Sequence, residues 1–166
     1  LHLGYAFKAI AHALESFEGI RRRIEILGAQ SQIAVLDDYG HHPTEIKATL
    51  AGTREKFPKA KIWAIFQPHL AERLSLLFSD FATAFHEADQ VIILETYKVL
   101  GRESVSPKNR DAKSLAKKLA FYQPARFMRN SKDVFRTIKK ETTKGDILLF
   151  MGAGNIKNLS DKLIKC

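Results

Sequence analysis

The sequence predicts an α/β fold with a doubly wound, mainly parallel sheet and helices on both faces. Short apolar runs alternate along the chain with amphipathic segments of helical period. The apolar runs lack polar alternation, which is typical of strands buried on both faces of a parallel sheet. Strand and helix alternating in this way predict a Rossmann-like domain.

Five segments have the composition of buried strands. The clearest are QIAVL, KIWAIF, QVIILE and DILLFM, and ARFM is a weaker candidate. Short apolar runs bounded by polar residues favour strands over helices when they are rich in β-branched residues. The predicted strands cover residues 32–36, 61–66, 90–95, 125–128 and 146–151.

Apolar residues at helical spacing predict helices between these strands. Pro43 suits the first turn of one helix, and Asp111 and Ser131 are candidate N-caps of two others. One long amphipathic helix is expected over residues 70–88. The other predicted helices cover residues 1–17, 43–57, 111–122, 131–143 and the end of the chain from residue 158.

A domain boundary is predicted between Gly19 and Gly28. The first helix ends near Gly19, and three arginines follow before the first predicted strand. We therefore expect residues 1–27 to be the end of a preceding domain with its linker, and residues 28–166 to form the α/β domain. The chain has 166 residues and is 45% hydrophobic, which is enough for one domain with a full core.

The composition of the sequence indicates where in the cell the protein is expected to be. The sequence has no apolar run of about 18 residues that would span a membrane, and its first 13 residues lack the layout of a signal peptide. The single cysteine, Cys166, cannot form an internal disulfide or a cysteine-based zinc site. A single cysteine with no internal partner favours a reducing, cytoplasmic location.

The net charge of +9 allows three interpretations. Basic residues gather in Arg21-Arg22-Arg23 and in residues 102–144. A lysine-rich solvated surface is the simplest interpretation, and a surface for nucleic acid or for anionic small molecules is the alternative. Neither cluster lies in a recognisable nucleic-acid-binding motif.

Polar side chains follow the first predicted strand, where ligands of open α/β sheets bind. Residues 37–45, DDYGHHPTE, place acids, a tyrosine and two histidines at one strand-to-helix turn. Acids there can accept hydrogen bonds from ribose hydroxyls, and histidine can contact a carboxylate or phosphate. A helix cap with exposed histidines is the structural alternative.

Two later strands end in similar turns. Gln67-Pro68-His69 follows the second strand, and Arg73 comes four residues after His69, so a shared helix face would make a clamp for an anion. An ordinary capping segment with a solvated Arg73 is the alternative. The turn at residues 152–155, GAGN, lacks the third glycine of a dinucleotide fingerprint, and the sequence has no GxxxxGK[ST] phosphate loop.

These segments resemble the C-terminal domain of the Mur ligases. The run VLDDYGHHPTEIKATL, residues 35–50, is similar to the signature of the members that attach L-alanine. FQPH at residues 66–69 and FMGAGNI at residues 150–156 resemble later motifs of the same members. FEGIRRRIE at residues 17–25 resembles the junction between the central and C-terminal domains, so the resemblance covers nearly the whole chain.

The resemblance implies an ATP-dependent, amide-forming ligase of peptidoglycan synthesis with three domains. The N-terminal domain would hold the UDP-sugar, and the central domain would hold the phosphate loop and most contacts to ATP and magnesium. ATP would phosphorylate the lactyl carboxylate of UDP-N-acetylmuramate, and the amine of L-alanine would attack the acyl phosphate. Positioning and charge neutralisation carry most of such chemistry. The C-terminal domain alone would be inactive and would hold no metal ligand or catalytic residue.

The resemblance also implies roles for residues at its motif positions. Asp38 is expected at the ATP ribose, and Arg22 or Arg23 at the ATP phosphates. Leu70 stands where the family usually has an arginine after the histidine of FQPH, so one cation is missing. The residues expected to line the pocket for L-alanine and the acyl phosphate are Tyr39, His41, His69 and Arg73.

Two other functions stay open. The first is a related Mur-type ligase that attaches a whole peptide to the same sugar in wall recycling, and Leu70 is compatible with it. The second is a basic α/β module that binds nucleic acid, whose binding would fall steeply with salt and would not respond to ATP.

Overall fold

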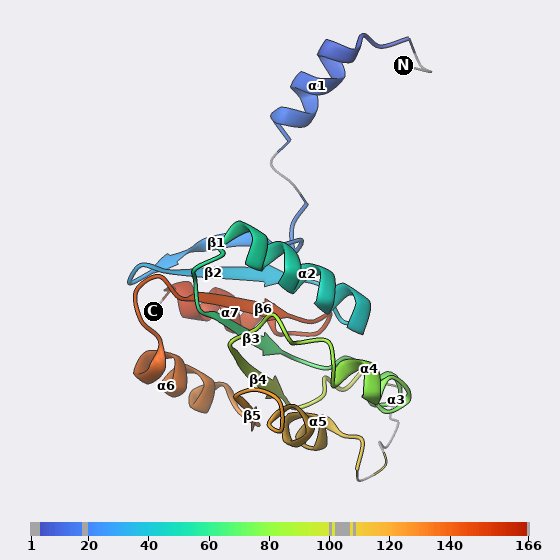
Figure 1. Ribbon diagram of the computed structural model, residues 1–166, viewed down its shortest axis with the longest axis vertical. Helices are drawn as coiled ribbons and strands as arrows, with labels where there is room; N and C mark the ends of the chain where they lie inside the picture. The colour runs from blue at the N-terminus through green and yellow to red at the C-terminus, as the bar shows by residue number, and fades with distance from the viewer. Residues whose placement is uncertain (1–3, 18–19, 100, 102–106, 108, 166) are drawn as a thin grey trace.

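A six-stranded sheet forms the centre of the protein (Figure 1). The computed structural model describes residues 4–17, 20–99, 101, 107 and 109–165. The strand order is β1-β2-β6-β3-β4-β5, and every neighbouring pair is parallel except β1 and β2. The predicted fold class is therefore confirmed. The strands are β1 (Glu25–Gln30), β2 (Ile33–Asp38), β3 (Ile62–Phe66), β4 (Gln90–Leu94), β5 (Ala125–Met128) and β6 (Ile147–Met151).

Helices cover both faces of the sheet and define two cores. Helices α2 (Pro43–Lys56), α3 (Ala71–Leu76), α4 (Phe78–Phe81) and α5 (Ala112–Leu119) cover one face, and α6 (Ser131–Glu141) and α7 (Lys157–Lys165) cover the other. Helix α1 (Phe7–Glu15) stands apart from the sheet and buries none of its residues (Figure 1).

Successive strand residues point into opposite cores. Leu36 and Phe66 lie in the core under α2 to α5, whereas Val35 and Trp63 lie in the core under α6 and α7. All four side chains are at most 1% exposed. Because both faces of the sheet are buried, both phases of each strand must be apolar, which explains the continuous apolar runs.

Strand β1 was not predicted from the sequence. It pairs antiparallel with β2 through a two-residue turn at Ser31 and Gln32, whose φ values are 51° and 65°. This is the pattern of a type I′ turn, which usually carries Asn-Gly, so Ser-Gln provides no hairpin signal. An irregular register between Ile26 and Gly28 further obscures the strand. Strand β1 also crosses the expected boundary, and the division into residues 1–27 and 28–166 stays a prediction.

Two helix expectations need correction. The long helix expected over residues 70–88 is broken into α3 and α4 at Leu77, whose φ and ψ of −101° and 23° are not helical, and turns follow α4. The break lets Leu74 and Phe81 both pack in the same core.

The N-cap of α6 is Asn130, and not Ser131, because Asn130 accepts a hydrogen bond from the Asp133 N–H at 2.9 Å. Asp111 caps α5 as expected.

The connections after the strands leave toward different faces. The chain passes from β2 to α2 and from β3 to α3 on one face, but from β5 to α6 and from β6 to α7 on the other. Diverging loops of this kind open crevices at the carboxyl ends of the strands. Within the described part of the chain, no helix is both long and apolar enough to cross a membrane.

Candidate functional site

The carboxyl ends of β2, β6 and β3 meet at one edge of the sheet. Asp38 and Phe66 both pair with Met151, and the Gly152 N–H donates to the Asp38 carbonyl at 3.1 Å. The Gln67 N–H donates to the Met151 carbonyl at 3.0 Å. The turns after these three strands therefore lie at the same edge, as the polarity of a parallel sheet predicts.

Four rings from the segments after β2, β3 and β4 form an aromatic array, defined by Tyr39, His41, His69 and Tyr97. The centroids of Tyr39 and His41 are 5.3 Å apart, and those of His41 and His69 are 6.1 Å apart. The rings of His69 and Tyr97 are stacked, with centroids 5.6 Å apart and an angle of 14°. The structure thus brings three predicted residues together. It adds Tyr97, whose only sequence signal is its place just after a predicted strand.

Glu45 shapes the turn that carries His41. Its Oε2 accepts hydrogen bonds from the backbone N–H groups of His41 and His42 at 2.8 and 3.0 Å, while His42 caps α2. Burial acts to raise the pKa of Glu45, but these hydrogen bonds and the nearby charges of His41 and Arg23 lower it below its usual value. The carboxylate therefore stays charged and holds the turn in place.

Asp38 is engaged inside the turn and is only 2% exposed. Its Oδ1 accepts hydrogen bonds from the Gly40 N–H at 2.7 Å and from Thr49 Oγ1 at 3.1 Å. Its Oδ2 accepts one from the Ile24 N–H at 2.9 Å. A carboxylate has about four acceptor positions, so a ribose hydroxyl would have to use the one that remains. The expected contact of Asp38 with ATP stays a prediction.

Arg22 is held within the sheet edge. Its Nε donates to Asp37 Oδ2 at 2.9 Å, its Nη2 donates to the Gly152 carbonyl at 2.6 Å, and its guanidinium lies 4.9 Å from the centre of the Tyr39 ring. Burial raises the pKa of Asp37, which is 0% exposed, and the hydrogen bond and charge of Arg22 partly offset this rise. Arg22 thus compensates a buried carboxylate.

Arg23 has a different setting from its neighbour. Its side chain is exposed, and its positive charge helps to lower the pKa of Glu45. The sequence left open which of Arg22 and Arg23 reaches the ATP phosphates. The exposure of Arg23 and the internal contacts of Arg22 favour Arg23 for that role.

The segment after β3 differs from expectation at His69. His69 lies before α3 and forms an isolated parallel bridge with Tyr97, so it does not share a helix face with Arg73. Leu70, the residue after His69, has a φ of 67°, which is uncommon for a residue other than glycine. Arg73 is half-buried, and its Nη1 has no hydrogen-bond partner among the described residues although it is shielded from solvent. A buried, unpaired guanidinium nitrogen is suited to an anionic ligand.

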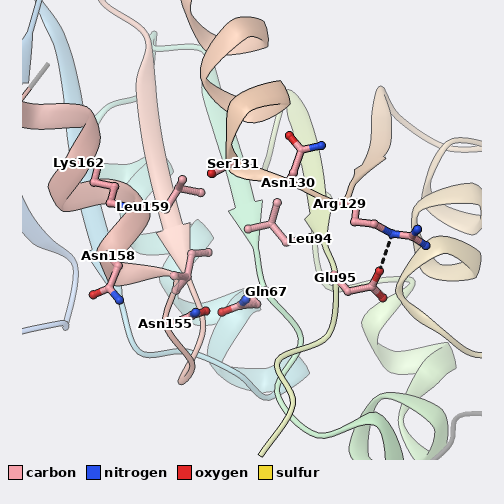
Figure 2. A pocket seen from close by; sticks show the side chains of 11 residues that line it. Gln67, Leu94, Glu95, Arg129, Asn130, Ser131, Asn155, Asn158, Leu159 and Lys162 are labelled. Carbon is pink, nitrogen blue, oxygen red and sulfur yellow. Dashed lines mark hydrogen bonds and ion pairs between the residues drawn. The ribbon is translucent and has the colours of Figure 1, made fainter.

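A cleft of about 240 Å³ lies on the face covered by α6 and α7 (Figure 2). Gln67 and Asn155 both line it, and Glu95 pairs with Arg129 at 3.1 Å on one side. Gln67 belongs to the same segment as His69, so the cleft adjoins the aromatic array at the sheet edge. The other polar residues that line it are Asn130, Ser131, Asn158 and Lys162.

Acidic and imidazole side chains do not gather into a metal centre in the described part of the chain. These ranges contain no group of three or more His, Cys, Asp or Glu side chains placed to hold a metal ion.

Comparison with known proteins identifies the family. The family model described as Mur ligase, glutamate ligase domain, matches residues 22–154. A UDP-N-acetylmuramate–L-alanine ligase of Sulfurihydrogenibium sp. is 40% identical over 98% of this chain and 35% of its own length. The crystal structure of UDP-N-acetylmuramate-alanine ligase from Thermotoga maritima matches with a TM-score of 0.79 and 30% identity, over 99% of this chain and 34% of that one.

A third match supports the fold alone. The murein peptide ligase of Psychrobacter arcticus superimposes with a TM-score of 0.69 at 24% identity, over 99% of this chain and 33% of that one. The chain spans about a third of the length of the curated relatives it matches. Together with the family model and the motif-bearing sheet edge, these matches show that the chain belongs to the Mur ligase family and corresponds to its C-terminal, glutamate ligase domain.

Proposed function

We propose that this chain is the C-terminal domain of an ATP-dependent ligase that joins L-alanine to UDP-N-acetylmuramate in peptidoglycan synthesis. The observation that carries the proposal is the convergence of Tyr39, His41 and His69 at one sheet edge. The 40% identity to a ligase named for this reaction supports it. The single cysteine supports a cytoplasmic setting.

In this proposal the domain positions charged groups and does not supply a nucleophile. Arg73 and His69 would contact the carboxylate of L-alanine and the acyl phosphate, where charge-assisted hydrogen bonds offset negative charge. Tyr39 and His41 would complete the wall of this pocket. Holding the amine of L-alanine against the acyl phosphate turns an encounter in solution into a reaction between oriented groups.

ATP would be held partly by this domain. Arg23 would contact its phosphates, and Asp38 would accept a ribose hydrogen bond at its remaining acceptor position. ATP supplies the phosphoryl group that activates the lactyl carboxylate. On the resemblance to the Mur ligases, we assign magnesium and its ligands mainly to the central domain of the ligase.

We also propose that residues 1–27 belong to the end of a preceding, central domain and its linker. Helix α1 supports this, because it exposes a row of apolar side chains and buries none of its residues. An amphipathic helix gains stability by burying its apolar face against another element. The exposed large apolar side chains in and beside α1 are Tyr5, Phe7, Leu14 and Phe17.

A second candidate is a Mur-type ligase that attaches a peptide instead of free L-alanine. Leu70 favours it, because an apolar side chain replaces a cation next to His69. A free amino acid offers its carboxylate close to its amine, whereas a peptide offers it farther away. The loss of one nearby cation is therefore easier to accommodate for a peptide.

Phosphate release by the three-domain ligase would distinguish these candidates. The assay contains UDP-N-acetylmuramate and ATP, with either L-alanine or an L-alanine-initiated tripeptide as the acceptor. We expect release with L-alanine at a kcat/KM well above that with the tripeptide. The reverse preference would support the peptide ligase, and no release with either acceptor would contradict both.

A further inference from the structure

Tyr97 holds the segment that carries His69 through its backbone and its ring. Its N–H donates to the Pro68 carbonyl at 2.8 Å, and it forms the parallel bridge with His69. Its ring lies nearly parallel to the imidazole, at 14°. The phenol therefore has a fixed place relative to His69.

Gly154 lies against the same ring from the turn after β6. A Cβ placed at Gly154 would be 2.7 Å from Tyr97 Cγ, 2.9 Å from Tyr97 Cβ and 2.7 Å from Gln67 Oε1. Atoms do not approach so closely without one of them moving. Any side chain at position 154 would thus displace Tyr97 or Gln67, and glycine leaves room for both.

The imidazole of His69 contacts two other rings. His41 approaches it at an angle of 63° with centroids 6.1 Å apart, while Tyr97 stacks on it. The next residue, Leu70, has a φ of 67°, a conformation that persists only where surrounding structure imposes it. The contacts with His41 and Tyr97 therefore contribute to the orientation of the His69 ring.

We propose that Tyr97, seated against Gly154, is a positioning residue that sets the plane of the His69 imidazole toward the acceptor amino acid and the acyl phosphate. This inference rests on the proposed function, in which His69 contacts those groups. Both ring nitrogens lie in the imidazole plane, so fixing the plane fixes the direction of their hydrogen bonds. The stacking needs an aromatic ring and not the phenol hydroxyl, so phenylalanine should replace tyrosine.

The ring contact is testable in this chain without any activity. The carbon-bound imidazole protons of His69 are recorded by NMR and assigned by their loss in His69→Gln. We expect Tyr97→Leu and Gly154→Ala to shift these resonances, and Tyr97→Phe to keep them near their original positions. Tyr122→Leu removes a ring that is 69% exposed and lies on the segment before β5, so it is the matched control and should leave them unchanged. Unchanged His69 resonances in a folded Tyr97→Leu protein would overturn the inference.

Kinetics of the three-domain ligase test the consequence. Tyr97→Leu should lower kcat/KM for L-alanine roughly tenfold, because a small misplacement of a substrate-contacting group is costly, and should change the KM for ATP by less than about twofold. Tyr97→Phe should recover most of the loss. If His69→Gln impairs the enzyme and Tyr97→Leu does not, the inference is wrong and the proposed function stands. If His69→Gln has no effect, the proposed site is wrong and the inference fails with it.

Discussion

Arg22 donates a 2.6 Å hydrogen bond from Nη2 to the carbonyl of Gly152, 130 residues later in the chain. The same guanidinium pairs with buried Asp37, so one side chain ties the segment before β1 to the ends of β2 and β6. This contact closes the sheet edge on which the candidate site is built.

Arg22→Ala should destabilise the domain by about 3 kcal/mol, because removing one partner of a buried ion pair leaves an uncompensated charge. The charge left behind would be that of Asp37, which is 0% exposed. Urea unfolding followed by circular dichroism measures the change. Arg136→Ala removes an arginine whose side chain is 78% exposed and pairs with Asp133, so it should cost less than about 1 kcal/mol. Equal losses in both variants would contradict a structural role for Arg22.

The stability of the domain should fall in acid partly through Glu45. The pKa of this carboxyl is lowered from 4.5, since the backbone hydrogen bonds and charges outweigh the effect of burial. Its contribution is therefore present above pH 4.5 and is lost as the pH falls through the lower pKa of the folded state.

Glu45→Gln should lower the Tm at pH 7 and flatten its decline toward acid pH, because glutamine has no charge to lose. Scanning calorimetry between about pH 3 and pH 7, across the ordinary carboxyl range, records this. Glu55→Gln makes the same change at an exposed position of the same helix and controls for the removal of one acid. If the decline of Tm toward acid pH were equally flattened in both variants, the acid sensitivity would not come from the contacts of Glu45.

The 166-residue chain alone should have no ligase activity. Its sequence contains no GxxxxGK[ST] motif, so it lacks the loop that would cradle the phosphates of ATP. Phosphate release with UDP-N-acetylmuramate, L-alanine, ATP and magnesium is the measurement, with the three-domain ligase as the positive control. Steady turnover by the isolated chain would refute the assignment of ATP activation to another domain.

Arg73→Ala in the three-domain ligase should impair the use of L-alanine more than that of ATP. A charge-assisted hydrogen bond contributes about 1.5–3 kcal/mol, so its loss should lower kcat/KM for L-alanine about tenfold to a hundredfold. Steady-state kinetics with each substrate varied separately would separate the two effects. Arg136→Ala is again the matched control. If Arg73→Ala changed kcat/KM for L-alanine by no more than about twofold, Arg73 would not contact the substrate.

The strands of the parallel sheet and the positions of its functional turns follow from local sequence patterns. Runs such as 62–66 and 147–151 are apolar in both phases, and this periodicity depends only on neighbouring side chains along the chain. The polarity of a parallel sheet then places the ends of these strands at one edge. Tyr39, His41 and His69 could therefore be predicted as neighbours from the sequence alone.

The side chains that occupy that edge, and the contacts they make, depend on the assembled sheet. Strand β6, the last in sequence, lies between β2 and β3, and this order brings Gly152 to Arg22 and Gly154 to Tyr97. No local pattern distinguishes Arg22 from Arg23, or signals a turn with positive φ at Ser31. These features depend on contacts between residues far apart in the chain. Such contacts stabilise the protein only after the strands have paired and the carboxylates are buried.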